Sequence, residues 1–126
     1  MPSRPQPFRP RGQPSAQAVD RDRGSSRQRG YDSRWDDASR AFRRANPLCQ
    51  YCEAGAFGPV RVSASVLTDH LYPHRRYEGV FWRTEWWVAA CTDCHSGPKQ
   101  QAELQGLPAL HRLAAVLARP QWRGGG

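Results

Sequence analysis

The sequence predicts a small α+β fold built around a β-β-α unit. Two short stretches, 60–68 and 86–90, are rich in β-branched or aromatic residues and read as strands. Apolar residues at helical spacing precede and follow them. Two Cys-x-x-Cys pairs lie beside the strands and can close the unit. At 126 residues the chain is long enough for one domain.

The first thirty residues form a basic arm in this prediction. They contain seven arginines and two aspartates, and their only large apolar residues are Met1, Phe8 and Val19. Such a segment buries too little surface to offset its ordering entropy, so we expect residues 1–30 to be disordered. The arm either adds sequence-independent phosphate contacts or takes no part in any reaction.

The charge and the flanking segments restrict the setting of the protein. A formal net charge of +8 favours a polyanionic partner such as nucleic acid, although a basic tail that only maintains solubility is the alternative. No apolar run is long enough for a transmembrane helix, and the N-terminus lacks the apolar region of a secretory signal. We therefore expect no membrane partner and a cytoplasmic location, where thiols bind metal more often than they form disulfides.

The folded domain is expected to span 31–119. Its first helix begins at Asp32 or Ser33 and ends before Pro47. The arginines off its apolar stripe are either a solvated face or flank a DNA groove. The stripe itself consists of Trp35, Ala38, Phe42 and Ala45.

The two strands and the closing helices follow. The first strand, 60–68, places Val60, Val62, Ala64 and Val66 on one face, and the second, 86–90, leads to the second cysteine pair. Residues 99–105 predict a short helix, and Pro108 opens another. Residues 120–126 are expected to be a flexible tail.

The four cysteines predict a structural metal site. Cys49 and Cys52 form one pair, and Cys91 and Cys94 form the other after thirty-eight intervening residues. Zinc takes four tetrahedral ligands, and a two-residue gap lets each pair bind from one turn. A site with four thiolates leaves no position for water, so zinc here would be structural. Disulfides and a redox pair are the alternatives, but no thioredoxin-like pattern surrounds either pair.

A second group of residues suits metal-assisted phosphoryl transfer. Asp69 at a strand end supplies a carboxylate, and His95, directly after Cys94, supplies an imidazole. His70 is then available as a general base, since imidazole titrates near neutral pH. Neighbours on a strand face opposite sides, so Asp69 and His70 converge on one site only if the chain bends there.

Residues 31–103 resemble the HNH endonucleases, especially the small type encoded by tailed phages near their packaging genes. The shared motifs occur in the family's order and at matching intervals, over a little more than half of the chain. They are Asn-Pro-Leu-Cys-x-x-Cys at 46–52, Asp69-His70, Pro73-His74, Phe81-Trp82, and Trp87 through Cys91-x-x-Cys94-His95.

The resemblance implies a ββα-metal (His-Me finger) fold with a structural zinc ion, and cleavage of DNA phosphodiester bonds with Mg²⁺ or another divalent metal. By that resemblance Asp69 and His95 hold the catalytic metal and His70 is the general base. His74 matches a histidine common in the phage subgroup, which implies a contact with metal or phosphate, and a solvated loop histidine is the alternative. Lys99 resembles the family lysine that follows the last histidine, displaced here by one residue, which implies a phosphate contact. Phage enzymes of this type work beside a terminase, which makes packaging proteins candidate partners in a bacterial, phage or prophage setting.

One position departs from the family pattern. The family has an asparagine five residues before the third cysteine, where this chain has Trp86. Asparagine both donates and accepts hydrogen bonds, whereas tryptophan has one donor and no acceptor. The alternative function is therefore a zinc-stabilised nucleic-acid-binding module with weakened or lost catalysis.

Overall fold

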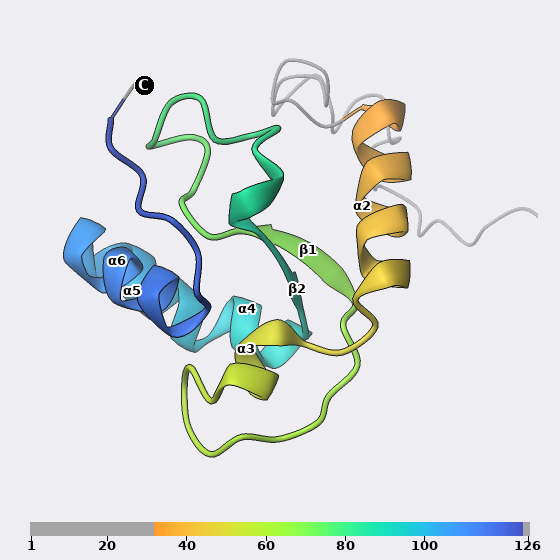
Figure 1. Cartoon of the computed structure of the whole chain (residues 1–126), viewed down its shortest axis with the longest axis horizontal. Helices are drawn as coiled ribbons and strands as arrows, with labels where there is room; N and C mark the ends of the chain where they lie inside the picture. The colour runs from red at the N-terminus through yellow and green to blue at the C-terminus, as the bar shows by residue number, and fades with distance from the viewer. Residues whose placement is uncertain (1–31, 125–126) are drawn as a thin grey trace, which may run out of the picture. The chain divides into compact units, whose positions relative to one another are not determined.

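The computed structural model describes residues 32–124. The arm expected over 1–30 lies outside the described residues, as do Tyr31, Gly125 and Gly126. The chain divides after Asp32, and the unit that begins at Ser33 carries every element below. In chain order these are α2 (Ser33–Ala45), α3 (Gln50–Ala54), β1 (Leu67–His70), a 3₁₀ turn (Thr84–Trp86), β2 (Trp87–Ala90), α4 (Thr92–Ser96), α5 (Pro98–Gln105) and α6 (Leu107–Val116) (Figure 1).

The sheet is a two-stranded antiparallel pair, which confirms the predicted small α+β class. Asp69 lies opposite Val88, and His70 lies opposite Trp87. Successive side chains of a strand leave the sheet on opposite faces. The carboxylate of Asp69 and the imidazole of His70 therefore face different layers of the fold.

Helix α2 covers the face that carries His70 and Trp87. Trp35 stacks on the His70 ring at 4.9 Å between centroids and meets Trp87 edge-on at 5.1 Å. Ser39 Oγ donates to Thr68 Oγ1 at 2.7 Å, which joins the helix to β1. Figure 1 shows α2 on one side of the sheet and the later helices on the other.

The C-terminal residues return to the long connection between the strands. Trp86 Nε1 donates to the carbonyl oxygen of Pro120 at 2.7 Å, and Trp122 Nε1 donates to that of Glu78 at 3.0 Å. The Trp122 ring also packs on Tyr77, with centroids 5.0 Å apart. Pro120 and Trp122, which lie in the segment expected to be a tail, thus contact the connection.

The expected strand over 60–68 is wrong for most of its length. Only residues 67 and 68 of that stretch belong to β1, and Val60 and Val62 are 70% and 78% exposed. β2 has only four residues, so it pairs with no more than 67–70. The preceding stretch instead runs along the first cysteine turn, where Cys49 N donates to Ser63 O and Ser65 N donates to Pro47 O.

Between residues 32 and 124, no helix has the length and apolar character needed to cross a membrane.

Candidate functional site

Two equivalent helical turns present the four cysteines. Cys49 precedes α3 and accepts a hydrogen bond at Sγ from the backbone N–H of Cys52. Cys91 precedes α4 and accepts in the same way from the N–H of Cys94. Each turn therefore orients two sulfurs and supplies the donor that stabilises a thiolate at its first residue.

The four sulfurs are positioned to hold one metal ion. Their Sγ atoms all lie within 4.8 Å of one another, and Cys52 Sγ is 3.9 Å from Cys91 Sγ and 3.6 Å from Cys94 Sγ. Zn–S bonds of about 2.3 Å in a tetrahedron place sulfurs about 3.8 Å apart. All four cysteines are unpaired and buried, which is compatible with structural zinc. Among the described residues this is the one group of three or more candidate ligands within such a distance.

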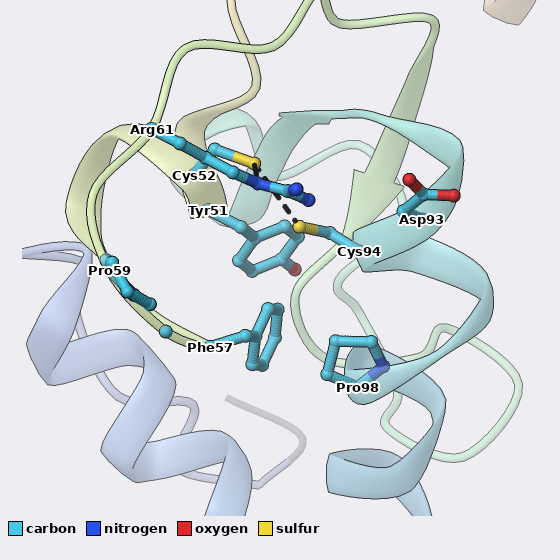
Figure 2. Close-up of a pocket in the computed structure, with 10 residues that line it drawn as sticks. Tyr51, Cys52, Phe57, Pro59, Arg61, Asp93, Cys94 and Pro98 are labelled. Atoms are coloured by element: carbon cyan, nitrogen blue, oxygen red, sulfur yellow. Dashed lines mark hydrogen bonds between the residues drawn. The ribbon is translucent and has the colours of Figure 1, made fainter.

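Arg61 supplies positive charge beside the sulfurs. Its Nε donates to Cys52 Sγ at 3.2 Å, and Figure 2 shows the guanidinium lying across Cys52 and Cys94. Hydrogen bonds to these sulfurs raise the arginine pKa, whereas burial raises the pKa of the Cys94 thiol. A Cys₄ zinc site carries excess negative charge, so a cation at this place would favour the thiolate state.

A cavity of about 280 Å³ opens beside the cluster. The loop after α3 forms one wall, with Phe57 and Pro59, and Asp93 and Pro98 stand on the other (Figure 2). The loop leaves α3 through Gly55, whose φ of +65° is left-handed. A Cβ there would also approach Val60 Cγ2 to 3.1 Å, so glycine is needed for this turn.

Asp69 lies at the centre of a buried polar cluster on the face of β1 opposite α2. Its Oδ2 accepts from the hydroxyl of Tyr51 at 2.7 Å and forms an ion pair with Lys99 Nζ at 3.0 Å. Its Oδ1 lies 3.6 Å from Nε2 of His95, a side chain that is 38% exposed. The structure thus brings together Asp69 and His95, the two residues expected to hold the catalytic metal.

Lys99 belongs to this cluster and is fully buried. Besides Asp69, its ammonium binds Glu103 Oε2 at 2.6 Å and donates to the backbone oxygen of His70 at 3.0 Å. The structure places this group inside the domain, although the sequence suggested a phosphate contact. Two carboxylates surround one ammonium, so the cluster keeps one negative charge in excess.

The Tyr51 hydroxyl remains a donor in this setting. Burial raises the tyrosine pKa well above its usual range, and the neighbouring Asp69 carboxylate raises it further. The phenol therefore stays protonated at neutral pH and donates to the carboxylate.

His70 occupies the opposite face of β1, in an aromatic layer. Its Nε2 lies 3.0 Å from the carbonyl oxygen of Phe81, and a carbonyl only accepts, so Nε2 carries the hydrogen. Nδ1 is then the nitrogen that can accept a proton. Burial lowers the pKa of His70 to about 4, so the ring is neutral at pH 7.

His74 lies beside His70 rather than beside Asp69. Its ring is 5.0 Å from that of His70 and 4.7 Å from that of Phe81. Burial, together with Arg75, lowers its pKa. The structure therefore groups the predicted site residues into two sets, Asp69 with His95 and Lys99 on one face of β1, and His70 with His74 on the other.

Trp86 stands at the position where the resemblance to the HNH endonucleases implies an asparagine. Trp86 is buried and its ring meets that of Tyr72 edge-on, with centroids 5.6 Å apart. Its indole N–H donates to the carbonyl oxygen of Pro120. The next residue, Trp87, donates from Nε1 to the Phe81 carbonyl at 2.9 Å. Trp87, one position after Trp86, therefore donates to the same carbonyl oxygen that binds His70.

Sequence reasoning missed Tyr51, Glu103 and the Phe81 carbonyl as members of these clusters. Glu103 follows Lys99 by four residues, a spacing that indicates an ion pair on a helix. Tyr51 and Phe81 both lie in motifs shared with the HNH endonucleases, but those motifs do not indicate a contact with Asp69 or His70. Comparisons with protein-family models, with curated proteins and with solved structures gave no match to this chain.

Proposed function

We propose that the protein is a divalent-metal-dependent endonuclease of the HNH type, which hydrolyses DNA phosphodiester bonds and holds a structural zinc ion between its four cysteines. The observation that carries the proposal is the 3.6 Å approach of Asp69 Oδ1 to His95 Nε2. Asp69 is on β1 and His95 is on the helix after β2, and this β-β-α order supports the proposal of a ββα-metal fold.

The donor set of Asp69 and His95 fits a hard divalent cation. Adjacent ligands of an octahedral ion with bonds of about 2.1 Å lie about 3.0 Å apart, so a shift of less than 1 Å brings both atoms to such an ion. The excess negative charge of the Asp69 cluster favours a cation there. Mg²⁺ or a similar metal, when bound, supplies charge stabilisation at the scissile phosphate and the leaving oxygen.

In this proposal His70 accepts the proton of the attacking water at Nδ1. The Phe81 carbonyl fixes the tautomer that presents this nitrogen, and the lowered pKa keeps the ring neutral. β1 ends at His70, so a phosphate at the end of the strand has access to side chains from both of its faces. Burial makes the ring a weak base, and contact with substrate and water would raise its basicity.

Features on the His70 face suit a nucleic-acid partner. Trp82 is 39% exposed and contacts both Trp35 and Phe81. The guanidinium of Arg34 lies 4.3 Å from the centroid of the Trp82 ring. Aromatic rings and arginine planes together stack on bases and bind phosphates. In the proposed bacterial, phage or prophage setting the enzyme would act on DNA in the cytoplasm beside a terminase.

A second function has its own supporting observation. Lys99 already forms an ion pair with Asp69 Oδ2. Trp86, at the family's asparagine position, is a core residue whose N–H donates to Pro120. A zinc-stabilised module that binds nucleic acid without cleaving it would retain both features. The two functions differ in whether His70 has any effect on the DNA.

A plasmid-nicking assay tests the proposal. Wild type, His70→Ala and the control His111→Gln are each incubated with supercoiled plasmid and Mg²⁺, Mn²⁺ or no metal, after zinc content and circular dichroism establish folding. His111 lies on α6, forms a hydrogen bond with the hydroxyl of Tyr72 and belongs to neither cluster. Metal-dependent nicking by wild type and His111→Gln, lost in His70→Ala, is the expected result. Folded, zinc-loaded wild type that binds plasmid but never nicks it establishes the binding module instead.

A further inference from the structure

We infer that Tyr51 is a positioning residue through which the four-cysteine cluster orients the carboxylate of Asp69. The inference rests on the proposed function, because it assigns Asp69 to the catalytic metal. It goes beyond that function because the affinity of the Asp69 site for its metal then depends on Tyr51, a side chain of the first cysteine turn.

The first step is the place of Tyr51 in the chain. It lies between Cys49 and Cys52, inside the first cysteine turn, and is fully buried. Figure 2 shows its ring leaving α3 beside Cys94 and Phe57, and the Phe57 centroid is 5.1 Å away. The ring therefore lies beside the four-cysteine cluster and directs its hydroxyl to Asp69 on β1.

The second step concerns the different contacts that the two carboxylate oxygens of Asp69 make. The terminal torsion of a carboxylate is broad, so an unrestrained group presents either oxygen. Here both donors, Tyr51 and Lys99, bind Oδ2, and Oδ1 is the atom that faces His95. The two donors therefore select which oxygen is presented to a metal.

The third step concerns the two cysteine turns together. Tyr51 directly precedes Cys52, and His95 directly follows Cys94, so each turn carries one neighbour of Asp69. The sulfurs of Cys52 and Cys94 lie 3.6 Å apart. A metal ion held by the four cysteines would fix the spacing of the two turns, and thereby the spacing of Tyr51 and His95 on either side of the carboxylate. Partners that orient a metal ligand in this way change metal affinity by roughly 10- to 100-fold when removed.

The substitution Tyr51→Phe tests the inference, since it keeps the packed ring and removes only the donor. Tyr77→Phe is the matched control, because it makes the same chemical change in a buried ring that packs on Trp122. Each protein is loaded with zinc, its zinc content is measured, and Mn²⁺ affinity is determined from the electron paramagnetic resonance of free Mn²⁺. We expect Tyr51→Phe to bind Mn²⁺ roughly 10- to 100-fold more weakly, while Tyr77→Phe matches wild type.

The outcomes separate the inference from the proposed function. Equal Mn²⁺ affinity and nicking rate in wild type and Tyr51→Phe overturn the inference and leave the nuclease intact. Wild type that binds Mn²⁺ without nicking plasmid overturns the nuclease, and the variant comparison still decides the role of Tyr51. Wild type that binds no Mn²⁺ overturns both.

A second measurement covers the case in which Tyr51→Phe fails to retain zinc. Wild-type protein labelled with 3-fluorotyrosine is titrated with Mg²⁺, and its four fluorine resonances are assigned from single Tyr→Phe variants at the other three positions. The Tyr51 resonance should shift on Mg²⁺ addition while that of Tyr77 does not. An unmoved Tyr51 resonance at saturating Mg²⁺ overturns the inference.

Discussion

His70 Nε2 and the carbonyl oxygen of Phe81 lie 3.0 Å apart, across the eleven-residue interval between them. The same oxygen accepts from Trp87 Nε1 at 2.9 Å. One backbone carbonyl therefore ties the end of β1 to the start of β2 and fixes the hydrogen of the imidazole on Nε2.

The first prediction concerns pH. Burial holds the pKa of His70 at about 4, below the 6.5 of an exposed imidazole, so the folded state binds fewer protons than the unfolded state between these values. The contribution of the neutral, buried His70 ring to the free energy of unfolding is fully present above pH 6.5. It is lost as the pH falls to about 4. We expect a loss of up to about 3 kcal/mol in the free energy of unfolding over this range.

Urea unfolding of wild type and His70→Gln at several pH values measures this contribution. Protonation of the cysteine cluster affects both proteins, so the difference between them isolates His70. The variant should lose less stability on acidification. Parallel pH profiles for the two proteins would show that His70 does not titrate as described.

The second prediction concerns Trp87. Trp87→Phe keeps an aromatic ring against Trp35 but removes one of the two donors on the Phe81 carbonyl. A hydrogen bond of about 1 kcal/mol corresponds to roughly a fivefold change in rate, so nicking should slow by about that factor. Trp122→Phe removes a comparable indole donor, from the Glu78 carbonyl, and should leave the rate unchanged. Equal rates for Trp87→Phe and wild type would contradict a role for this contact.

The third prediction concerns zinc removal. Structural zinc binds with an apparent free energy of about 10–16 kcal/mol, comparable to or larger than the whole stability of a small domain. Chelation at pH 7 should therefore unfold the protein, as judged by circular dichroism and zinc analysis of the same sample. Replacement by Co²⁺ should restore the fold and give the visible absorption of tetrahedral cobalt thiolates. A native spectrum at zero measured zinc would show that the cluster is dispensable.

The fourth prediction concerns Trp122. Trp122→Ala removes its ring from Tyr77 and its donor from the Glu78 carbonyl, so the free energy of unfolding should fall by about 2 kcal/mol. Leu104→Ala alters a side chain that is 75% exposed, so it should change the free energy of unfolding by less than about 0.5 kcal/mol. Thermal unfolding of the two variants measures both values. Equal stability would place residues 120–124 outside the cooperative unit.

The elements that the sequence predicted well are those with strong local signals. The first helix follows from its capping residues and apolar spacing and is found at Ser33–Ala45. The four cysteines were predicted to converge because each pair binds from one turn, and their sulfurs do converge. The helix and each cysteine pair depend on residues close together in the chain. The two pairs are thirty-eight residues apart, and the preference of zinc for four ligands is what predicts that they meet.

The errors come from interactions between distant segments. The alternation of Val60, Val62 and Val66 predicts a buried strand face, yet all three are exposed because β2 offers only four residues for pairing. The burial of Lys99 was likewise not predicted, because it depends on Asp69, thirty residues earlier in the chain. The separation of Asp69 from His70 followed from strand geometry, but the layers on each side became known only from the structure.

Four residue pairs hold the two strands together, and their register has a consequence for how this chain tolerates length changes. A one-residue insertion or deletion within Leu67–His70 or Trp87–Ala90 would reverse every side chain beyond it. Asp69 would then enter the aromatic layer, and an imidazole would meet the ammonium of Lys99. The exposed positions near Gly79 in the connection between the strands, or at 58–59 in the loop after α3, lie outside that register. Natural length variation should therefore accumulate in those loops and be absent from the eight strand positions.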